Sequence, residues 1–422
     1  MSWETVRLGD IAEFSNGINF DKSAYSKGVK LIGVSNFGNR FSPDYDSLEE
    51  IKKEVVRSND YLRNEDIVFV RSNGNKELVG RCMLINNPES PVTYSGFCIR
   101  ARLNDTKRHN PVFFTYLFKS SDFRKAMTGS AVGANIQNLS QGRLSACEVK
   151  IPNYDLQVRI ADILSAYDDL IENNQKQIKL LEEAAQRLYK EWFVDLRFPG
   201  YENTPIIDGV PQGWRKVSLG ELIEYEIGGG WGEDQPTEKC DLPAYVIRGT
   251  DLYDVTHGNA KSIPYRFHAK SNLDSRKLQD GDIVFEVSGG SKNEGVARTA
   301  LITESLLDFL GGDVICASFC KLIRFEDKSL AKYMYDTFQY LRNSGETVKY
   351  DKRSASSIVN YRWKDFLEQQ FIFVSTVDIL TQYNALAENM QNAIVNKAQI
   401  IEQAKQARDR LLPKLMSGEL EV

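Results

Sequence analysis

An internal duplication constrains the fold of this chain more than any other feature of its sequence. The string GDIVFEVSGG at residues 281–290 has a near copy, EDIVFVRSNG, at residues 65–74. Close to the N-terminus, WETVRLGDIAEF is likewise matched by WRKVSLGELIEY in the middle of the chain. The matching pieces keep one order and their offset grows slowly, as loop insertions in the second copy would produce. The sequence therefore predicts two copies of one module.

Each copy combines a β-rich part with a long helix. Strand-like runs such as DIVFV and TALI alternate with Gly, Asn and Ser turns, and NPVFFTYLFKSSDFRKAM (110–127) predicts a helix. The predicted fold class is α+β, with two β-rich α/β lobes, two long antiparallel coiled-coil helices and an internal pseudo-two-fold duplication. The predicted segments are a first lobe at 1–155, a helix at 156–195, a linker at 196–213, a second lobe at 214–376, and a helix with a C-terminal tail at 377–422.

The two long helices carry a heptad seam, because their apolar residues recur at alternating steps of four and three. A helix over residues 156–193 would be about 57 Å long. Neither helix can bury its stripe alone, so the two are expected to pack on each other; the alternative is that each lies on its own lobe. Pro413 is expected to end the second helix. The seam comprises Ile160, Leu164, Tyr167, Ile171, Asn174, Ile178, Leu181, Ala185, Leu188 and Trp192, then Tyr383, Ala387, Met390, Ile394, Lys397, Ile401, Ala404, Arg408, Leu411 and Leu415.

Composition excludes several classes of protein. The net charge is −5, although residues 1–150 are net positive, so a nucleic-acid surface would have to be a local patch. The six cysteines form no CxxC pair and there are three histidines, which argues against disulfides, a metal site and imidazole catalysis. No apolar run approaches the ~18 residues of a membrane span, and no signal-peptide core is present. The sequence therefore predicts a non-catalytic cytoplasmic protein without a cofactor of its own.

One stretch imitates a nuclease signature. PDYDSLEEIKKE (43–54) contains Glu50 and Lys52 after a Pro-Asp pair, but its spacing leaves little room for two separate metal-binding strands. The second copy has no equivalent. We therefore interpret this stretch as a charged loop or helix, with an autonomous nuclease as the weakest of the functional hypotheses.

Polar loops after the repeated Ile-Val-Phe strand are the first candidate DNA-binding residues. Small residues allow close approach to phosphates, and Asn and Arg can pair with adenine and guanine edges. Plain hairpin turns remain an equally good interpretation, because Asn-Gly and Gly-Gly are also common hairpin signals. The candidates are Arg71, Ser72, Asn73, Gly74, Lys76 and Arg81 in the first copy, and Ser288, Gly289, Gly290, Lys292, Asn293 and Arg298 in the second.

A second polar loop occurs in each copy. TGSAVGANIQNLS (128–140) and KYDKRSASSIVN (349–360) have matching flanks but different chemistry. Two modules that read different DNA half-sites would show this pattern, and so would neutral drift of loops. The candidates here are Asn135, Gln137, Asn138, Lys352 and Arg353.

Taken together, these motifs resemble the specificity subunit (HsdS) of type I restriction–modification systems over essentially the whole chain. The resemblance rests on LGDIAEF and LGELIEY, on DIVFVRSNG and DIVFEVSGG, and on the helix start LQVRIADILSAYDDLIENN (156–174). The link EWFVDLRFPG followed by GVPQGW, and the ending LLPKLMSGEL, add to it. The second helix departs from the family, because VDILTQYNALAENMQ lacks the Gln-x-x-Ile-Ala found at Gln157–Ala161.

The resemblance implies a function. Each lobe would be a target recognition domain reading one half of a split double-stranded DNA sequence, and the conserved spacer helices would dock two methyltransferase subunits (HsdM). Those partners would use S-adenosylmethionine to methylate adenine N6, and restriction subunits (HsdR) would add ATP- and Mg²⁺-dependent cleavage. The alternative hypothesis is a coiled-coil protein-interaction scaffold without DNA readout. The recognised bases and the spacer length do not follow from the sequence, because no residue-to-base code holds across folds.

Overall fold

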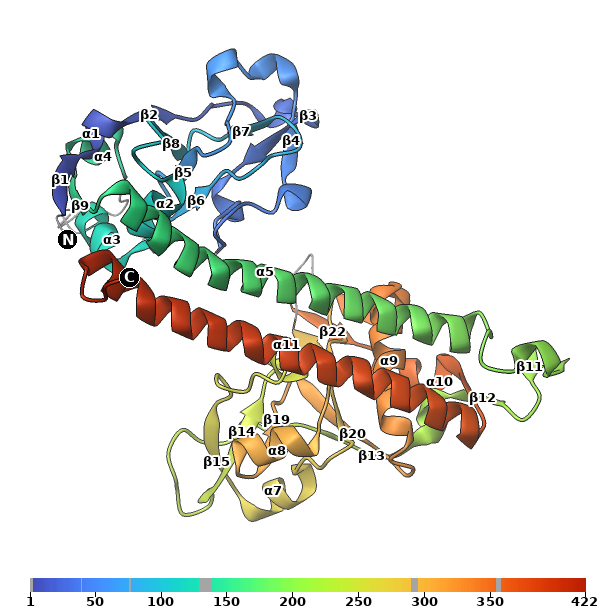
Figure 1. Ribbon diagram of the computed structural model, residues 1–422. Helices are drawn as coiled ribbons and strands as arrows, with labels where there is room; N and C mark the ends of the chain where they lie inside the picture. Colours follow the sequence, from blue (N-terminus) through green and yellow to red (C-terminus); the bar gives the residue numbers. More distant parts are fainter. Residues whose placement is uncertain (1–2, 39, 76, 129–137, 290–294, 354–357) are drawn as a thin grey trace. The chain divides into compact units, whose positions relative to one another are not determined.

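A computed structural model describes residues 3–38, 40–75, 77–128, 138–289, 295–353 and 358–422 (Figure 1). The chain divides into two compact units. The first unit consists of residues 1–172 with 403–422, and the second of residues 173–402. Each unit therefore holds one β-rich lobe together with a part of each long helix.

The lobe of the first unit is built on a four-stranded and a three-stranded sheet. The four-stranded sheet is antiparallel in its described pairs and has the order β2-β8-β5-β6. The three-stranded sheet has the order β4-β3-β7, with β3 and β7 parallel. These strands are β2 (Ala12–Asn16), β3 (Tyr25–Ile32), β4 (Glu49–Ile51), β5 (Ile67–Val70), β6 (Cys82–Leu84), β7 (Val92–Tyr94) and β8 (Cys98–Leu103), with β1 (Glu4–Arg7) paired to β9 (Glu148–Ile151).

The lobe of the second unit repeats this topology strand for strand. Its four-stranded sheet has the order β13-β20-β16-β18, and its three-stranded sheet the order β15-β14-β19, again with one parallel pair. This agreement confirms the predicted duplication. The strands are β13 (Ile223–Gly228), β14 (Leu242–Ile247), β15 (Tyr265–His268), β16 (Ile283–Glu286), β18 (Thr299–Leu301), β19 (Val314–Cys316) and β20 (Cys320–Phe325), with β12 (Arg215–Ser218) paired to β23 (Phe371–Val374).

The repeated Ile-Val-Phe strand lies inside each four-stranded sheet. Every residue of β5 and of β16 is buried, and each strand is paired on both sides. A strand covered on both faces requires a continuous apolar run rather than alternation, which explains the Ile-Val-Phe sequence. The polar loops that follow this strand therefore start from a rigid base.

Both long helices are present and each shares in both lobe cores. Helix α5 covers Tyr154–Tyr189 and passes into a π-helical turn at Lys190–Val194, and α11 covers Val377–Ser417. In the first unit, Leu164 and Leu415 are fully buried in one core with the lobe. In the second unit, Tyr189 and Tyr383 share a core with the other lobe. The alternative in which each helix packs only on its own lobe is therefore wrong.

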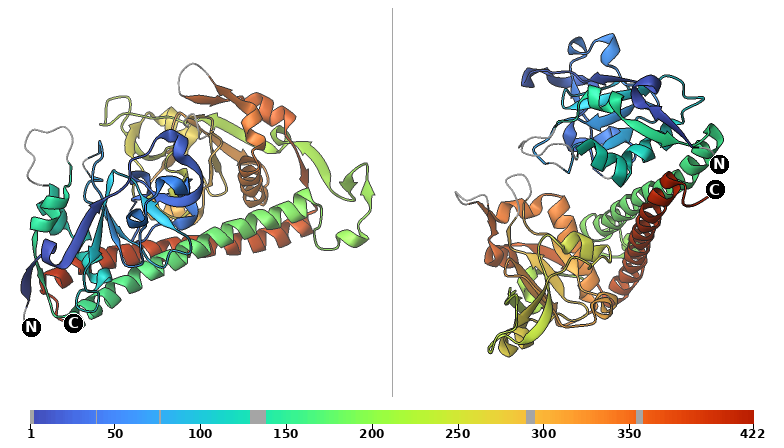
Figure 2. Two further views of the ribbon diagram at one scale, coloured as in Figure 1. Left: turned by 90° about the horizontal axis from the view of Figure 1, so that it is seen from above. Right: turned by 90° about the vertical axis from the view of Figure 1, so that its left-hand side faces the viewer.

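Every residue of the predicted seam is buried or half-buried. The polar Asn174 is as buried as the seam residues Ile171 and Ile178. Within the second unit, the ammonium group of Lys397 donates a hydrogen bond to Gln177 Oε1. In that unit α5 and α11 run side by side and antiparallel, since Gln177 faces Lys397 whereas Tyr189 packs on Tyr383 (Figures 1 and 2). Buried seam residues are Ile160, Leu164, Ile171, Asn174, Ile178, Trp192, Tyr383, Ala387, Ile394, Ile401, Ala404 and Leu415; half-buried ones are Tyr167, Leu181, Ala185, Leu188, Met390, Lys397, Arg408 and Leu411.

Pro413 does not end the second helix. Helix α11 continues through it to Ser417, with the proline ring exposed to solvent. Helix continuation past a proline costs about 3 kcal/mol. Leu415 is fully buried in the core of the first unit, and burial of a leucine contributes ~1.5–3 kcal/mol. Tertiary packing therefore offsets the helix-breaking tendency that the sequence prediction relied on.

Two further predictions need correction. The helix expected at 110–127 is broken at Ser120 into α2 (Pro111–Lys119) and α3 (Ser121–Thr128), because Ser120 Oγ accepts a hydrogen bond from Phe123 N and caps the second segment. The stretch expected as a charged loop or helix contains strand β4, where Glu50 accepts a 2.7 Å hydrogen bond from Gly28 N. Glu50 thus has a local structural role.

Candidate nucleic-acid interface

In the first lobe, the two predicted polar loops come together at one place. Arg71 N donates to the carbonyl of Phe97 at 2.8 Å, and Leu139 N donates to the carbonyl of Arg71 at 2.9 Å. Ser72 and Asn138 form an antiparallel bridge. Loops that are far apart in sequence are thereby joined by main-chain hydrogen bonds at the end of β5.

The second lobe repeats these bonds. Val287 N donates to the carbonyl of Phe319 at 2.9 Å, and Tyr361 N donates to the carbonyl of Val287 at 2.9 Å. Ser288 is paired with Asn360, both in the strand register and through a 2.8 Å hydrogen bond from Ser288 Oγ to Asn360 Oδ1. The two candidate surfaces are therefore built in the same way from different side chains.

A small extra sheet extends the surface of the second lobe. Strands β17 (Ser288–Gly289), β22 (Val359–Tyr361) and β21 (Asp351–Arg353) pair in the order β17-β22-β21. Lys352 lies opposite Asn360 in this register, and both Lys352 and Arg353 are exposed. Gly289 has a φ of 134°, a conformation that favours glycine. The sheet thus places Lys352 and Arg353 on the same element as Ser288.

The polar side chains of the first loop are partly used in holding its shape. The guanidinium of Arg71 donates to the carbonyl of Gly96 at 3.2 Å. Asn73 Oδ1 accepts from Asn75 N at 2.7 Å, which is an Asx turn, and Arg81 Nε donates to the carbonyl of Glu77 at 3.2 Å. A Cβ at Gly74 would meet no atom within 4 Å, so the backbone there is open to approach.

Arg298 has a clear structural role at the base of the second loop. Its guanidinium donates to both oxygens of Glu286, at 2.8 and 2.5 Å, and Glu286 is buried at the end of β16. A bidentate pair of this kind fixes both side chains. Other predicted residues lie outside the part of the chain that the structure describes: Lys76, Asn135, Gln137, Gly290, Lys292 and Asn293.

Sequence reasoning missed two aromatic residues on this surface. The side chains of Phe97 and Phe319 are 62% and 54% exposed, and their carbonyls accept the main-chain hydrogen bonds of the loop that follows the repeated strand. The dipeptide Phe-Cys occurs at residues 97–98 and again at 319–320, and this repeat was the one signal in the sequence for the two rings. Nothing in the sequence indicated that these two rings face solvent.

A basic cavity of about 180 Å³ adjoins the first loop within the first unit. Arg81, Lys119 and Arg124 line it, together with the ion pair of Asp168 and Arg408. Lys119 Nζ donates to the carbonyl of Arg40 at 2.8 Å, and Arg124 donates to the carbonyl of Glu77. Burial lowers the pKa of Lys119, and it lowers the pKa of Arg124 with a further contribution from Arg81. Burial thus disfavours both cationic forms, and an anion placed in the cavity would offset that cost.

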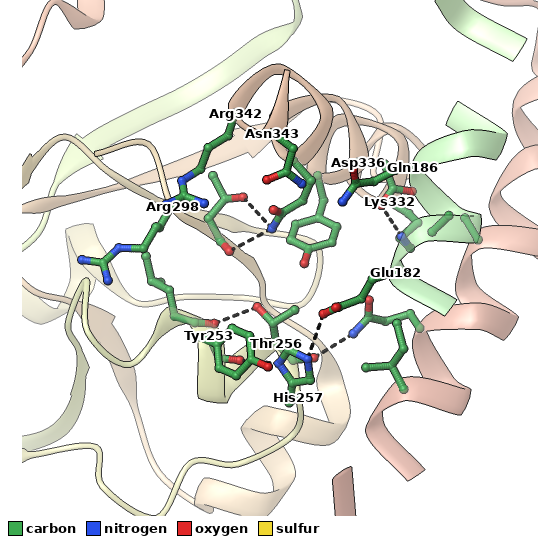
Figure 3. A pocket seen from close by; sticks show the side chains of 18 residues that line it. Glu182, Gln186, Tyr253, Thr256, His257, Arg298, Lys332, Asp336, Arg342 and Asn343 are labelled. Carbon is green, nitrogen blue, oxygen red and sulfur yellow. Dashed lines mark hydrogen bonds and ion pairs between the residues drawn. The ribbon is translucent and has the colours of Figure 1, made fainter. Parts of the chain in front are cut away.

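The second unit contains a larger cavity of about 380 Å³, lined by α5, α6 (Leu252–Thr256), α9 (Leu330–Asn343) and α11 (Figure 3). Asp336 accepts from Lys332 at 2.5 Å and from the hydroxyl of Tyr383 at 2.7 Å. His257 Nε2 lies 3.1 Å from Glu182 Oε1, which ties α6 to α5. These contacts join the lobe to both helices.

Gln157 links the start of α5 to the first lobe through hydrogen bonds. It is buried, its amide donates to the carbonyl of Pro152 at 2.9 Å, and its Oε1 accepts from Asn110 N at 2.9 Å. It thereby joins the helix start to the start of α2. Sequence alignment of the copies places the apolar Leu380 at the corresponding position, so this polar link is replaced by packing in the second unit.

The architecture defines a class: two copies of one α+β module carried on shared long helices. Residues 1–183 match the family model described as the type I restriction modification DNA specificity domain. The chain is 26% identical over 330 residues to the type I restriction enzyme MjaIX specificity subunit of Methanocaldococcus jannaschii, covering 74% of this chain and 69% of that protein. It is 22% identical over 369 residues to the StySPI specificity subunit of Salmonella potsdam, covering 84% and 74%.

A solved structure shows the same fold. The S subunit of the type I restriction–modification system from M. genitalium superposes with a TM-score of 0.57 at 14% identity, covering 98% of this chain and 96% of that one. The chain is therefore similar over most of its length to specificity subunits of type I restriction–modification systems, and the family model matches its first lobe with part of α5. In the part of the chain that the structure describes, no helix combines the length and the apolar character needed to cross a membrane.

Proposed function

We propose that the chain reads a bipartite DNA target, with one half-site assigned to each lobe. The observation that carries this proposal is the matched loop junction. In each lobe, the loop after the repeated strand donates main-chain bonds to the carbonyl of a phenylalanine and accepts one from the second loop. The main-chain bonds are the same in both lobes, whereas the side chains differ. A common frame with different polar groups suits two readers of unlike base sequences.

We further propose that adenine-N6 methyltransferase subunits (HsdM) dock on the helices α5 and α11. In the second unit these helices expose large aliphatic side chains, with Leu180 at 63%, Leu386 at 44% and Ile400 at 39%. Protein interfaces use such residues as buried anchors. The partners would supply S-adenosylmethionine, and restriction subunits (HsdR) would supply ATP- and Mg²⁺-dependent cleavage, so the chain itself would need no cofactor.

Methylation-aware sequencing tests the half-site assignment. The chain would be co-expressed with the modification subunit of the same system, and the methylated motif would be read from the host genome. The double variant Arg71→Ala/Asn73→Ala should degrade one half of a split motif, and Lys352→Ala/Arg353→Ala the other half. Equal loss at both halves from either variant would contradict the assignment.

The same experiment separates DNA recognition from a scaffold role. A coiled-coil scaffold would support assembly of the partners without setting any motif, so the variants would leave the methylated sequence unchanged. Mobility shift with the assembled complex, on a duplex carrying the motif and on an unrelated duplex, gives the direct measurement. Specific binding commonly exceeds non-specific binding by at least about 10³-fold.

A further inference from the structure

A phenylalanine occupies the same position of the same turn in each lobe. Cys98 N donates to the carbonyl of Ser95 at 2.8 Å, and Cys320 N donates to the carbonyl of Ala317 at 2.8 Å. These bonds close two four-residue turns, each with phenylalanine at its third position. Full burial of a phenylalanine contributes ~1.5–3 kcal/mol, yet both rings are more than half exposed. Exposure at both equivalent points therefore calls for an explanation.

Each ring stands beside the candidate reading loops. The carbonyl of Phe97 accepts from Arg71 N at 2.8 Å and from Ser72 N at 3.4 Å. The carbonyl of Phe319 accepts from Val287 N at 2.9 Å and from Ser288 N at 3.2 Å. A group brought to the surface made by these loops comes within reach of the ring.

The loops differ between the copies, whereas the phenylalanine does not. After the repeated strand the sequence is RSNG in the first copy and VSGG in the second. The second loops supply Asn138 and Asn360 to the junctions, but the residues around these two asparagines differ. Different loops suit different base sequences. An unchanged apolar ring suits a contact that both half-sites can make, since an apolar wedge such as phenylalanine can insert between base steps of a duplex and there meets base faces whatever the sequence.

We propose that Phe97 and Phe319 are apolar contacts to DNA bases, one for each half-site, which add affinity without setting sequence preference. The proposal rests on the proposed DNA-reading function and adds two residues to it. The surroundings favour nucleic acid over protein, because the residues that bond the two phenylalanine carbonyls are Arg71 and Ser72 in one lobe and Ser288 with Val287 in the other, three of the four being polar. The core of a protein interface is apolar and depleted in charge.

The test compares single alanine variants in the full chain assembled with its modification subunits. Phe97→Ala and Phe319→Ala should each weaken binding to a fluorescent duplex carrying the methylated motif by roughly ten- to a hundred-fold. The ratio of affinities for matched and single-mismatch duplexes should stay constant, and the dependence on salt should be unchanged because no cationic side chain is removed. Phe97→Tyr should retain most of the affinity.

Phe309 provides a matched control. It is 61% exposed on α8 (Glu304–Leu310), so Phe309→Ala removes a ring of the same size and exposure away from the loops. Thermal unfolding of all variants checks that the fold is intact. Replacement of Phe97 by benzoylphenylalanine gives a direct readout, since irradiation should cross-link the chain to DNA.

The outcomes separate this inference from the function on which it rests. If the wild-type complex binds the motif and the two alanine variants bind as tightly as Phe309→Ala, the inference is wrong and the proposed function stands. Cross-linking to a partner protein in place of DNA would also overturn the inference. If the wild-type complex does not distinguish the motif from unrelated DNA, the proposed function and the inference fail together.

Discussion

The Asp66 carboxylate is held by the guanidinium of Arg102 through two hydrogen bonds of 2.7 and 2.6 Å. Asp282 and Arg324 repeat this pair in the second lobe, with both bonds at 2.7 Å. Each aspartate is buried and also accepts a 2.6 Å bond from the backbone N–H of the residue three positions before it. This explains the acidic residue before the repeated Ile-Val-Phe strand: it closes the preceding turn and links the two central strands.

Replacement of either aspartate should therefore destabilise its own lobe. Asp66→Asn preserves the shape but leaves the guanidinium of Arg102 without a charged partner, and loss of a buried pair costs about 3 kcal/mol. Asp282→Asn should act equally on the second lobe. Thermal unfolding followed by hydrogen exchange would locate the effect, with the exposed Asp10 in α1 (Leu8–Ile11) as an Asn-substituted control. Uniform loss of protection in both lobes would contradict the prediction.

The His257–Glu182 contact predicts a pH dependence of stability in the second unit. Burial disfavours the charged imidazole, but the bonds to Glu182 and to the carbonyl of Tyr253 outweigh it and raise the pKa of His257. A raised folded-state pKa means that the stabilisation is fully present below the unfolded value of 6.5 and is lost as pH rises through the folded-state pKa. We expect the free energy of unfolding to decrease over this pH range.

Thermal unfolding across this pH range, in wild type and in His257→Gln, measures the effect. The substitution should lower the unfolding temperature below the unfolded-state pKa and leave it nearly unchanged well above the folded-state pKa. Glu182→Gln should abolish the same pH-dependent part of the stability, because it removes the carboxylate that His257 pairs with. A His257→Gln profile parallel to that of wild type would show that the ion pair contributes nothing.

The basic cavity predicts a phosphate contact that is independent of sequence. Arg81→Gln should weaken binding to the motif and to unrelated DNA by similar factors, because a phosphate carries no base identity. The slope of log affinity against log salt should fall by about one unit when one phosphate interaction is removed. Titration at several salt concentrations measures both quantities. An effect confined to the motif would instead assign Arg81 to base readout.

The exposed aliphatic side chains of the helices predict where partners dock. Leu180→Glu places a charge on a side chain that is 63% exposed, so the isolated chain should keep its stability. Recovery of the modification subunit by co-purification should fall about ten-fold, because a charge would be buried at the interface. Gln175→Glu, on an exposed residue of the same helix, also adds one negative charge and is the matched control. Equal loss in both variants would indicate electrostatic repulsion in place of a missing apolar anchor.

Patterns that repeat along the chain predicted the fold well. The duplication indicated the two equivalent lobes, and the heptad spacing indicated the buried residues of both long helices, including the polar Asn174. Pro413 was misjudged because local propensity says nothing of the packing of Leu415. The break at Ser120 was missed because serine is common both inside helices and at their N-caps, so residue type alone does not show which role it has.

The candidate site was predictable in outline alone. Residue type and loop position identified Arg71, Ser72 and Asn138, but their hydrogen-bonded junction depends on the pairing of strands far apart in sequence. Arg298 was chosen for its charge, which could not reveal that the buried Glu286 holds it in a bidentate pair. Exposure of Phe97 was equally hidden, because an aromatic residue next to a strand is most often part of the core.

Leu415 fills the core of the lobe that is synthesised first, although the second lobe and most of both long helices precede it in the sequence. A ribosome adding ~5–20 residues per second would deliver it tens of seconds after Leu164, its partner in that core. During that interval the first lobe carries an incomplete hydrophobic centre. The order of translation therefore makes the first lobe the last to reach its final packing, and a nascent chain that is interrupted late leaves its earliest part unfinished.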